Sequence, residues 1–341
     1  MLSINFGKVH EHCELYSHGG TVGGTELKGM FHWVGKRIEK YLSDDILNSD
    51  PQADRADLLT LRDLLTPQEI MNILNCLPQD MLDKSSEYGP YNQTVISYTN
   101  AKGTRRTADI LPLLFNYKAF REHKDTIYNG FTLASQLGIS CCPYCNRNYT
   151  TTHQTYFIQK NGNSVQKRVY PEFDHFYAQA DHPVLGVSFY NLIPSCTICN
   201  THYKNNRDSS ALFHPYTLND PEAFKFHGFP KDVASLYGAG NEISLSFRYN
   251  CDPATETRLR SSHEFFGIKD IYDKCHGDLV KDIIYKKLAF GERYMHELSR
   301  TYGIGFEDSY RIVFETHFEN ENVNMRPFAK LKKDIFENKD L

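Results

Sequence analysis

Two short stretches, SCCPYC at residues 140–145 and SCTICN at residues 195–200, decide how the centre of this 341-residue chain is interpreted. Each contains a Cys-x-x-Cys pair, which alone is typical of either a thiol–disulfide enzyme or half of a metal site. Two pairs supply four thiolates, and a two-residue spacer lets both sulfurs of a pair reach one ion. We therefore predict a structural Zn²⁺ site made by four cysteines: Cys142, Cys145, Cys196 and Cys199.

The alternative is a glutaredoxin-like redox pair. It requires Cys142 at the start of a helix that follows a strand, with a lowered thiol pKa and no bound zinc. The residues after the first pair, 146–164, are instead typical of a loop and a hairpin, which favours the metal. Cys141 is interpreted as a small apolar neighbour, because only Cys142 has a partner at the right spacing. The remaining cysteines are expected to be buried apolar filler: Cys13, Cys76, Cys251 and Cys275.

Composition excludes several classes of protein. Hydrophobic residues make up 40% of the chain, charged residues 23%, and the formal net charge is −4, so any surface for nucleic acid must be local. Nine cysteines are an odd number, and the first residues carry no basic-then-apolar signal, which argues against a disulfide framework. No uncharged apolar run approaches the length that a bilayer requires. We expect a cytoplasmic protein with reduced thiols and no membrane segment.

The periodicity of apolar residues divides the chain into three regions and predicts an α+β fold. Residues 1–135 are expected to be mainly helical; the clearest helix starts after Thr66, with Pro67 at its first position and Glu69 closing a capping box. Residues 136–216 form a cysteine-rich centre. Residues 217–341 are expected to be mainly helical again and to offer a surface for a partner.

Strand signals concentrate in the centre. Runs at 154–159, 167–173 and 187–193 are rich in β-branched and aromatic residues, and an Asn-Gly turn within 160–164 should join the first two as a hairpin. In the last region we predict one strand at 242–250 and several helices. These are one long helix over 278–298 that ends near Gly303, and shorter helices within 307–318 and 326–336.

After the first cysteine pair the chain contains an Asp-His…Asn…Cys-x-x-Cys-Asn pattern, which includes the second pair. Asp174 and His175 are followed after sixteen residues by Asn191, and after nine more by Asn200. This order resembles the HNH, or His-Me finger, endonuclease superfamily, in the subgroup whose ββα-metal (treble-clef-like) motif is clamped by four cysteines. The resemblance covers about residues 140–216 and implies a nuclease module embedded between helical flanking regions.

The resemblance assigns His175 as general base and places Asp174 and Asn200 on one catalytic Mg²⁺ or Mn²⁺ ion. The chemistry of phosphodiester hydrolysis agrees with this, because an imidazole can take a proton from water near neutral pH. A divalent cation stabilises the charge that develops on the phosphate, and carboxylate and amide oxygens suit such a cation. Neighbouring strand residues point to opposite faces, so Asp174 and His175 share a site only where the strand ends or bends.

Further residues receive roles from the resemblance. Asn191 is implied to stabilise the loop next to the base, and Lys204, one residue later than in the family pattern, is implied to contact phosphate. His202 is either a further metal ligand or an exposed helical histidine. His214 is interpreted as a packed or capping histidine, with a place in the cleft as the alternative.

Basic residues near the module predict nucleic-acid contacts at Lys167, Arg168 and Arg207, with DNA the expected substrate. The pattern also resembles the PtuB-type nucleases of bacterial anti-phage systems (Septu- and retron-associated), which implies an ATPase protein partner. The competing hypothesis is a catalytically inactive, zinc-stabilised module that binds nucleic acid or protein. It requires that the set Asp174, His175 and Asn200 be incomplete, whereas all three are present.

Overall fold

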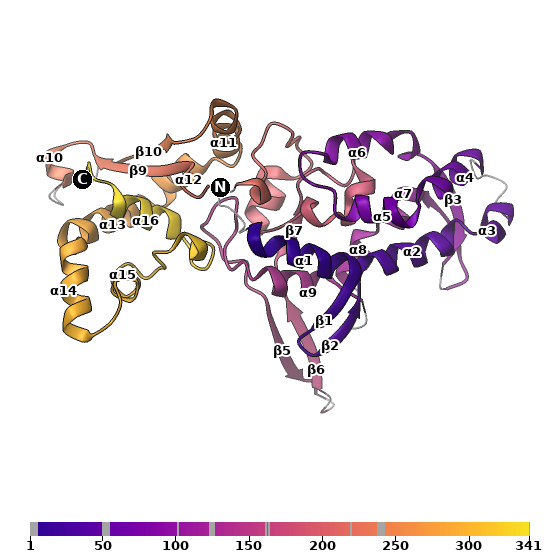
Figure 1. Ribbon diagram of the computed structural model, residues 1–341, viewed down its shortest axis with the longest axis horizontal. Coiled ribbons are helices and arrows are strands. Elements are labelled where there is room, and N and C mark those ends of the chain that lie inside the picture. Colours follow the sequence, from indigo (N-terminus) through magenta and orange to yellow (C-terminus); the bar gives the residue numbers. More distant parts are fainter. Residues whose placement is uncertain are drawn as a thin grey trace.

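The computed structural model mixes helices with short antiparallel strand pairs (Figure 1). Each sheet among the described residues has two strands. The structure describes residues 6–49, 55–100, 102–122, 127–160, 162, 164–218, 220–236 and 243–340. In Figure 1 the N-terminal helices occupy one end and the C-terminal helices the other, with the cysteine-rich centre between them. Among the described residues, no helix has the length and apolar character needed to cross a membrane.

The N-terminal region is mainly helical, as predicted. Its described helices are α1 (Phe6–His18), α2 (Met30–Tyr41), α3 (Asp44–Ser49), α4 (Arg55–Leu64), α5 (Pro67–Leu74), α6 (Met81–Glu87), η1 (Gly89–Tyr91), α7 (Ile110–Leu114), α8 (Tyr117–Glu122) and α9 (Gly130–Leu137). Helix α5 begins as predicted, because the Thr66 hydroxyl accepts a hydrogen bond from the Glu69 backbone N–H at 3.2 Å.

Two hairpins in this region were not predicted. Strand β1 (Gly19–Val22) pairs with β2 (Thr25–Lys28) across a turn in which Gly23 and Gly24 both have positive φ, the geometry of a tight hairpin. Strand β3 (Val95–Thr99) pairs with β4 (Arg105–Asp109). Its turn is held by the Asn100 side chain, which accepts hydrogen bonds from the backbone N–H groups of Lys102 and Thr104.

One apolar core runs from the N-terminal helices into the centre and on into the C-terminal helices. Tyr16 of α1 shows how it is joined. Its ring packs edge-on against Phe120, Tyr128 and Phe189, and its hydroxyl donates a hydrogen bond to the Val187 carbonyl at 2.7 Å. A buried hydroxyl without a partner would destabilise the fold, but this one is hydrogen-bonded. The bond therefore fixes α1 against the centre of the chain.

The centre contains two antiparallel strand pairs and short helical turns. Strand β5 (His153–Ile158) pairs with β6 (Ser164–Val169), the predicted hairpin, and β7 (Glu172–His175) pairs with β8 (Leu192–Ser195). The predicted strand 167–173 is therefore two strands, separated at Pro171, which cannot donate to a ladder. The predicted strand 187–193 is helical in its first half. The short helices are η2 (Pro183–Val187), η3 (Phe189–Asn191), η4 (Ile198–Lys204) and η5 (Pro215–Thr217).

The C-terminal region pairs β9 (Phe224–Pro230) with β10 (Ile243–Tyr249), which confirms the strand predicted at 242–250. Its helices are α10 (Val233–Leu236), α11 (Pro253–Phe265), α12 (Ile268–Cys275), α13 (Gly277–Ala289), α14 (Glu292–Tyr302), α15 (Phe306–Phe314), η6 (Asn320–Asn322) and α16 (Ala329–Glu337). The single helix predicted over 278–298 is wrong. Helix α13 ends at Ala289, where Phe290 leaves the helical conformation, and α14 starts after extended backbone at Gly291. Gly303 caps α14 in left-handed geometry, as expected.

Candidate metal centre and adjoining cleft

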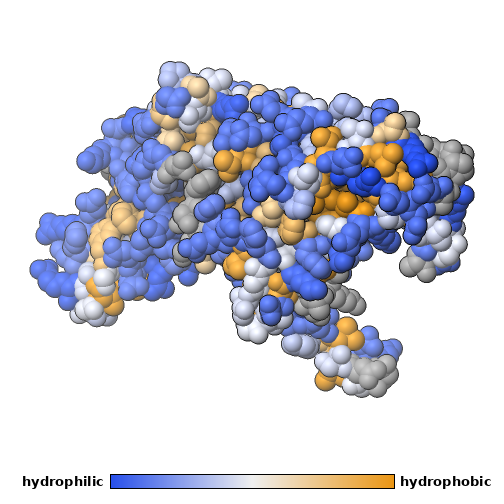
Figure 2. Space-filling view, turned by 45° about the vertical axis from the view of Figure 1, so that its right-hand side comes forward, coloured by the Kyte–Doolittle hydropathy of each residue, from blue (hydrophilic) through white to orange (hydrophobic). Residues whose placement is uncertain are grey.

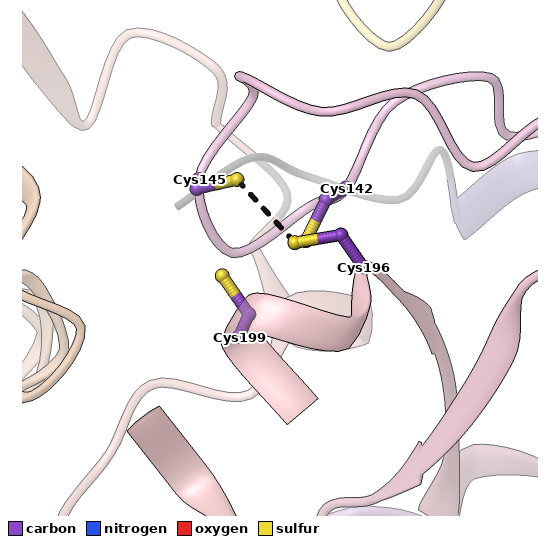
Figure 3. A group of neighbouring side chains, drawn as sticks. All are labelled: Cys142, Cys145, Cys196 and Cys199. Carbon is purple, nitrogen blue, oxygen red and sulfur yellow. Dashed lines mark hydrogen bonds between the residues drawn. The ribbon is translucent and has the colours of Figure 1, made fainter. Parts of the chain in front are cut away.

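The two cysteine pairs meet and form a buried cluster. The sulfurs of Cys142, Cys145, Cys196 and Cys199 all lie within 4.8 Å of one another, and their side chains converge in Figure 3. The Cys145 and Cys196 sulfurs are 4.0 Å apart. Zinc–sulfur bonds of about 2.3 Å in a tetrahedron place sulfurs about 3.8 Å apart. The four thiols therefore fit a structural metal such as zinc.

The cluster includes neither Cys141, as predicted, nor any of the isolated cysteines. Cys141 is buried, and so are Cys13 and Cys76. The interpretation of all isolated cysteines as buried filler is wrong for Cys275, which is exposed, and incomplete for Cys251, which is half-buried. Cys275 is the last residue of α12, and Cys251 lies between β10 and α11.

The first cysteine pair is held by polar contacts to its own loop and to the C-terminal region. Asn146 has positive φ, and its backbone N–H donates to the Cys142 carbonyl at 2.7 Å, which closes the turn. Its side chain donates to the Val323 carbonyl and accepts from the backbone N–H of Lys330. The Tyr272 hydroxyl donates to the Cys145 carbonyl at 2.8 Å. The C-terminal helices thus support the metal centre.

The cluster also carries features expected of thiolates on a metal. The Asn148 amide donates to the Cys196 sulfur at 3.4 Å, and such bonds stabilise negative charge on sulfur. Cys142 is fully buried. A redox cysteine requires exposure to its substrate, so the burial of Cys142 favours the metal interpretation over the glutaredoxin-like one.

A cleft of about 470 Å³ opens beside the cluster, at the end of strand β7. Glu172, Asp174 and His175 of β7 line it together with Asn200 of η4. The strand ends at His175, which is why residues on opposite faces of β7 reach one cleft. Asn200 follows Cys199 directly, so the cysteine cluster places this side chain opposite β7.

Asp174 is buried and already has two polar partners. The Tyr144 hydroxyl donates to its Oδ2 atom at 2.6 Å, and the Lys204 ammonium lies 3.2 Å from its Oδ1 atom. Burial raises the pKa of the Asp174 carboxyl to about 6, although Lys204 and Tyr144 act in the opposite direction. Its charge is therefore balanced within the protein before any cation binds.

Lys204 does not occupy the place that the resemblance implied. It is fully buried, and its Nζ atom donates to the His175 carbonyl at 2.5 Å as well as pairing with Asp174. The prediction of a phosphate contact at Lys204 is corrected on this geometry, because a buried ammonium with two protein partners is not offered to a ligand.

His175 is held in one tautomer. Its Nε2 atom lies 2.9 Å from the Gly186 carbonyl, which can only accept, so the proton is on Nε2 and the Nδ1 atom carries the free lone pair. Tyr117 packs edge-on against the ring with centroids 4.4 Å apart. Burial lowers the pKa of His175 to about 4. The hydrogen bond to the Gly186 carbonyl acts in the opposite direction, and the nearby Lys204 charge lowers the pKa further. The imidazole is therefore neutral at neutral pH.

Asn191 makes contacts that stabilise the loop after His175. Its side-chain oxygen accepts from the Tyr177 N–H at 2.8 Å, and its amide donates to the carbonyls of Tyr177 and Leu185. Its own carbonyl accepts from the Phe176 N–H. Leu185 precedes Gly186, so the same asparagine fixes the segment whose carbonyl orients His175.

Glu172 is a cleft residue that sequence reasoning missed. The Asn200 amide donates to its Oε2 atom at 3.0 Å, which joins β7 to η4 at the cleft. The signal was present, because Glu172 stands two residues before Asp174 and so faces the same side of a strand. Together they present carboxylate and amide oxygens, the donor types that suit Mg²⁺ or Mn²⁺.

The other predicted residues lie outside this set. His202 is exposed on η4, which agrees with its interpretation as an exposed helical histidine. His214 is buried, caps η5 by accepting from the Tyr216 N–H, and packs on Phe176, as interpreted. The Arg207 guanidinium lies 3.8 Å from the Phe265 ring centre, while Lys167 and Arg168 belong to β6. None of these residues lines the cleft.

Comparison of the chain with protein-family models, with curated proteins and with solved structures finds no match.

Proposed function

We propose that this chain is a metal-dependent endonuclease of the HNH type that hydrolyses phosphodiester bonds of DNA. The observation that carries the proposal is the neutral His175 imidazole, fixed through Nε2 on the Gly186 carbonyl, in a cleft shared with Asp174 and Asn200. Strands β7 and β8 followed by helix η4 also supply the strand–strand–helix order that the resemblance implies.

The residues of this chain would divide the work as follows. His175 takes a proton from the attacking water on its Nδ1 atom, since Nε2 is occupied and the ring is neutral near pH 7. A divalent cation, when bound, stabilises negative charge on the phosphate. Asp174, Glu172 and Asn200 would hold it, and Glu172 is the carboxylate among them without a buried lysine beside it.

A second candidate is the catalytically inactive, zinc-stabilised binding module. The observation that favours it is the buried ion pair between Lys204 and Asp174, because an ammonium beside the predicted ligand opposes binding of a cation there. In this alternative the four-cysteine cluster and Lys204 only hold β7 and η4 together. The two proposals differ in one measurable property, metal-dependent cleavage.

The deciding experiment is plasmid nicking in Mg²⁺ and in Mn²⁺ by the wild-type protein and a His175→Ala variant. His10→Ala, an exposed histidine on α1, is the matched control. The endonuclease proposal expects nicking by the wild type and the control, abolished by EDTA, and a loss of about a hundredfold or more in His175→Ala. Equal nicking by all three proteins points to a contaminant. No nicking by a folded, zinc-loaded wild type supports the inactive module.

The resemblance to anti-phage nucleases extends the proposal to an ATPase partner. Co-expression of this chain with a candidate ATPase, followed by size-exclusion chromatography and plaque assays, tests it. A complex whose protection against phage requires His175 supports this extension, and protection that survives His175→Ala argues against it.

A further inference from the structure

The β5–β6 hairpin is a two-stranded ribbon that projects from the body of the molecule (Figure 1). Nearly all its side chains are exposed on both faces. Tyr156, Phe157 and Ile158 near its tip are 64%, 50% and 81% exposed. Figure 2 shows apolar side chains on this projection. An isolated hairpin with exposed large apolar residues gains little stability from them, so they indicate a surface that something else contacts.

The charge of the ribbon has a single sign. Between His153 and Val169 the sequence contains Lys160, Lys167 and Arg168 and no acidic residue, on a chain whose net charge is −4. Within the described part of the chain, Lys160 and Lys167 form no ion pair. The Lys167 ammonium lies 5.8 Å from the centre of the Phe157 ring on the same ribbon, and the Arg168 guanidinium lies over Phe131 of α9. Two exposed ammonium groups without a counter-charge favour a polyanion over the mixed charges of a protein surface.

The base of the ribbon is fixed to the cleft. Strand β6 leads through Tyr170 and Pro171 directly into β7, which carries Asp174 and His175. The Tyr170 hydroxyl donates to the Arg121 carbonyl at 2.9 Å, and the Arg121 side chain lines the cleft. A six-residue strand spans about 17 Å, so a ligand gripped by the ribbon can also reach the cleft.

We propose that the β5–β6 ribbon is an arm that binds double-stranded DNA by entering a groove and so places the backbone at the cleft. The inference rests on the proposed function, whose substrate it makes more specific. The major groove of B-form DNA is about 12 Å wide and admits a two-stranded ribbon, whereas that of A-form RNA is too narrow. Lys160 and Lys167 contact phosphates, and Tyr156 and Phe157 make apolar contacts within the groove.

Fluorescence anisotropy of a short labelled DNA duplex, measured in EDTA across a salt series, tests the arm without cleavage. The charge variant is Lys160→Gln with Lys167→Gln; the aromatic variant is Tyr156→Thr with Phe157→Thr, which keeps β propensity. Lys102→Gln with Arg106→Gln is the control, because it removes the same charge from the exposed β3–β4 hairpin. Circular dichroism and zinc content verify folding of every variant.

We expect both ribbon variants to bind the duplex at least about tenfold more weakly than the control. The charge variant should also flatten the slope of log K against log salt by about 2, since two phosphate contacts are lost. Control-like binding by both ribbon variants, or no duplex binding by the wild type, overturns the arm. The arm is also overturned if the ribbon variants keep the duplex affinity of the control and lose only the binding of a protein partner.

Failure of the arm is distinguishable from failure of the proposed function, because binding is measured without a divalent cation. A wild type that binds through the ribbon yet never nicks DNA retains the arm and refutes the nuclease. A wild type that nicks DNA while its ribbon variants bind normally retains the nuclease and refutes the arm.

Discussion

The Nζ atom of Lys204 lies 3.2 Å from the Oδ1 atom of Asp174, and the two side chains are only 1% and 2% exposed. The same ammonium donates to the His175 carbonyl. One lysine of η4 therefore contacts both neighbouring residues of β7 that the sequence assigns to the site. Because a buried charge is costly without its partner, the pair fixes η4 against β7 and keeps Asn200 opposite Glu172.

The first prediction concerns this pair. Replacing Lys204 with Met leaves the Asp174 carboxylate buried without its cation, and we expect the free energy of unfolding at pH 7 to fall by about 3–5 kcal/mol. Lys269→Met is the control, because Lys269 forms an exposed pair with Asp273 one turn along α12, and its loss should cost less than about 1 kcal/mol. Urea unfolding at fixed pH measures both. Similar costs for the two variants would show that burial of the Lys204 pair has no energetic consequence.

The second prediction concerns the cysteine cluster. Cys196→Ser removes one of four converging sulfurs, so we expect loss of bound zinc and of the ordered centre rather than a local change. Cys275→Ser, at an exposed cysteine outside the cluster, should keep full zinc content and an unchanged melting temperature. Elemental analysis and thermal unfolding give both readouts. A zinc-loaded Cys196→Ser protein with wild-type stability contradicts the four-cysteine site.

A feature of this fold can be predicted from the sequence when the residues that determine it are close together along the chain. The cysteine cluster was predictable because Cys-x-x-Cys is a local geometric unit, and only one arrangement brings two such units to one ion. The cap at Thr66 and the β5–β6 hairpin were predictable for the same reason, since each depends on a few consecutive residues.

Other features depend on contacts between distant residues and were missed. Nothing in the spacing from Asp174 to Lys204 says that the lysine turns inward, because the packing of η4 on β7 decides it. The break of the long helix at Gly291 was also missed, since glycine within an apolar helical pattern only weakens the helix and tertiary packing decides whether it ends. Glu172 was overlooked although its strand position relative to Asp174 indicated it.

The third prediction concerns Glu172. If it helps to hold the catalytic cation, Glu172→Gln should raise the Mn²⁺ concentration for half-maximal nicking by about tenfold or more, since a neutral amide binds a hard cation more weakly. Glu11→Gln, on the exposed side of α1, is the matched control and should titrate like the wild type. An unchanged Mn²⁺ dependence in Glu172→Gln, with nicking retained, would assign Glu172 to the hydrogen bond with Asn200 alone.

The fourth prediction concerns pH and a buried pair in the C-terminal region. The Lys330 ammonium donates to Asp334 at 2.6 Å, and Asp334 also accepts from the Phe226 N–H, which attaches α16 to β9. Burial, only partly offset by Lys330, raises the pKa of Asp334 to about 6. A carboxyl whose folded pKa exceeds its unfolded pKa stabilises the fold below the unfolded value, and this contribution is lost as pH rises through 6.

The stability of the wild type relative to Asp334→Asn should therefore fall by about 2 kcal/mol between pH 4 and pH 7, since each pKa unit corresponds to about 1.4 kcal/mol and pH 4 already lies near the unfolded pKa. Denaturant unfolding of both proteins across this range measures the difference. Because the Lys330 N–H in the first turn of α16 donates to the Asn146 side chain, loosening α16 should also weaken zinc retention. A flat difference profile, with zinc content unaffected, would mean that Asp334 titrates normally and that α16 does not support the metal centre.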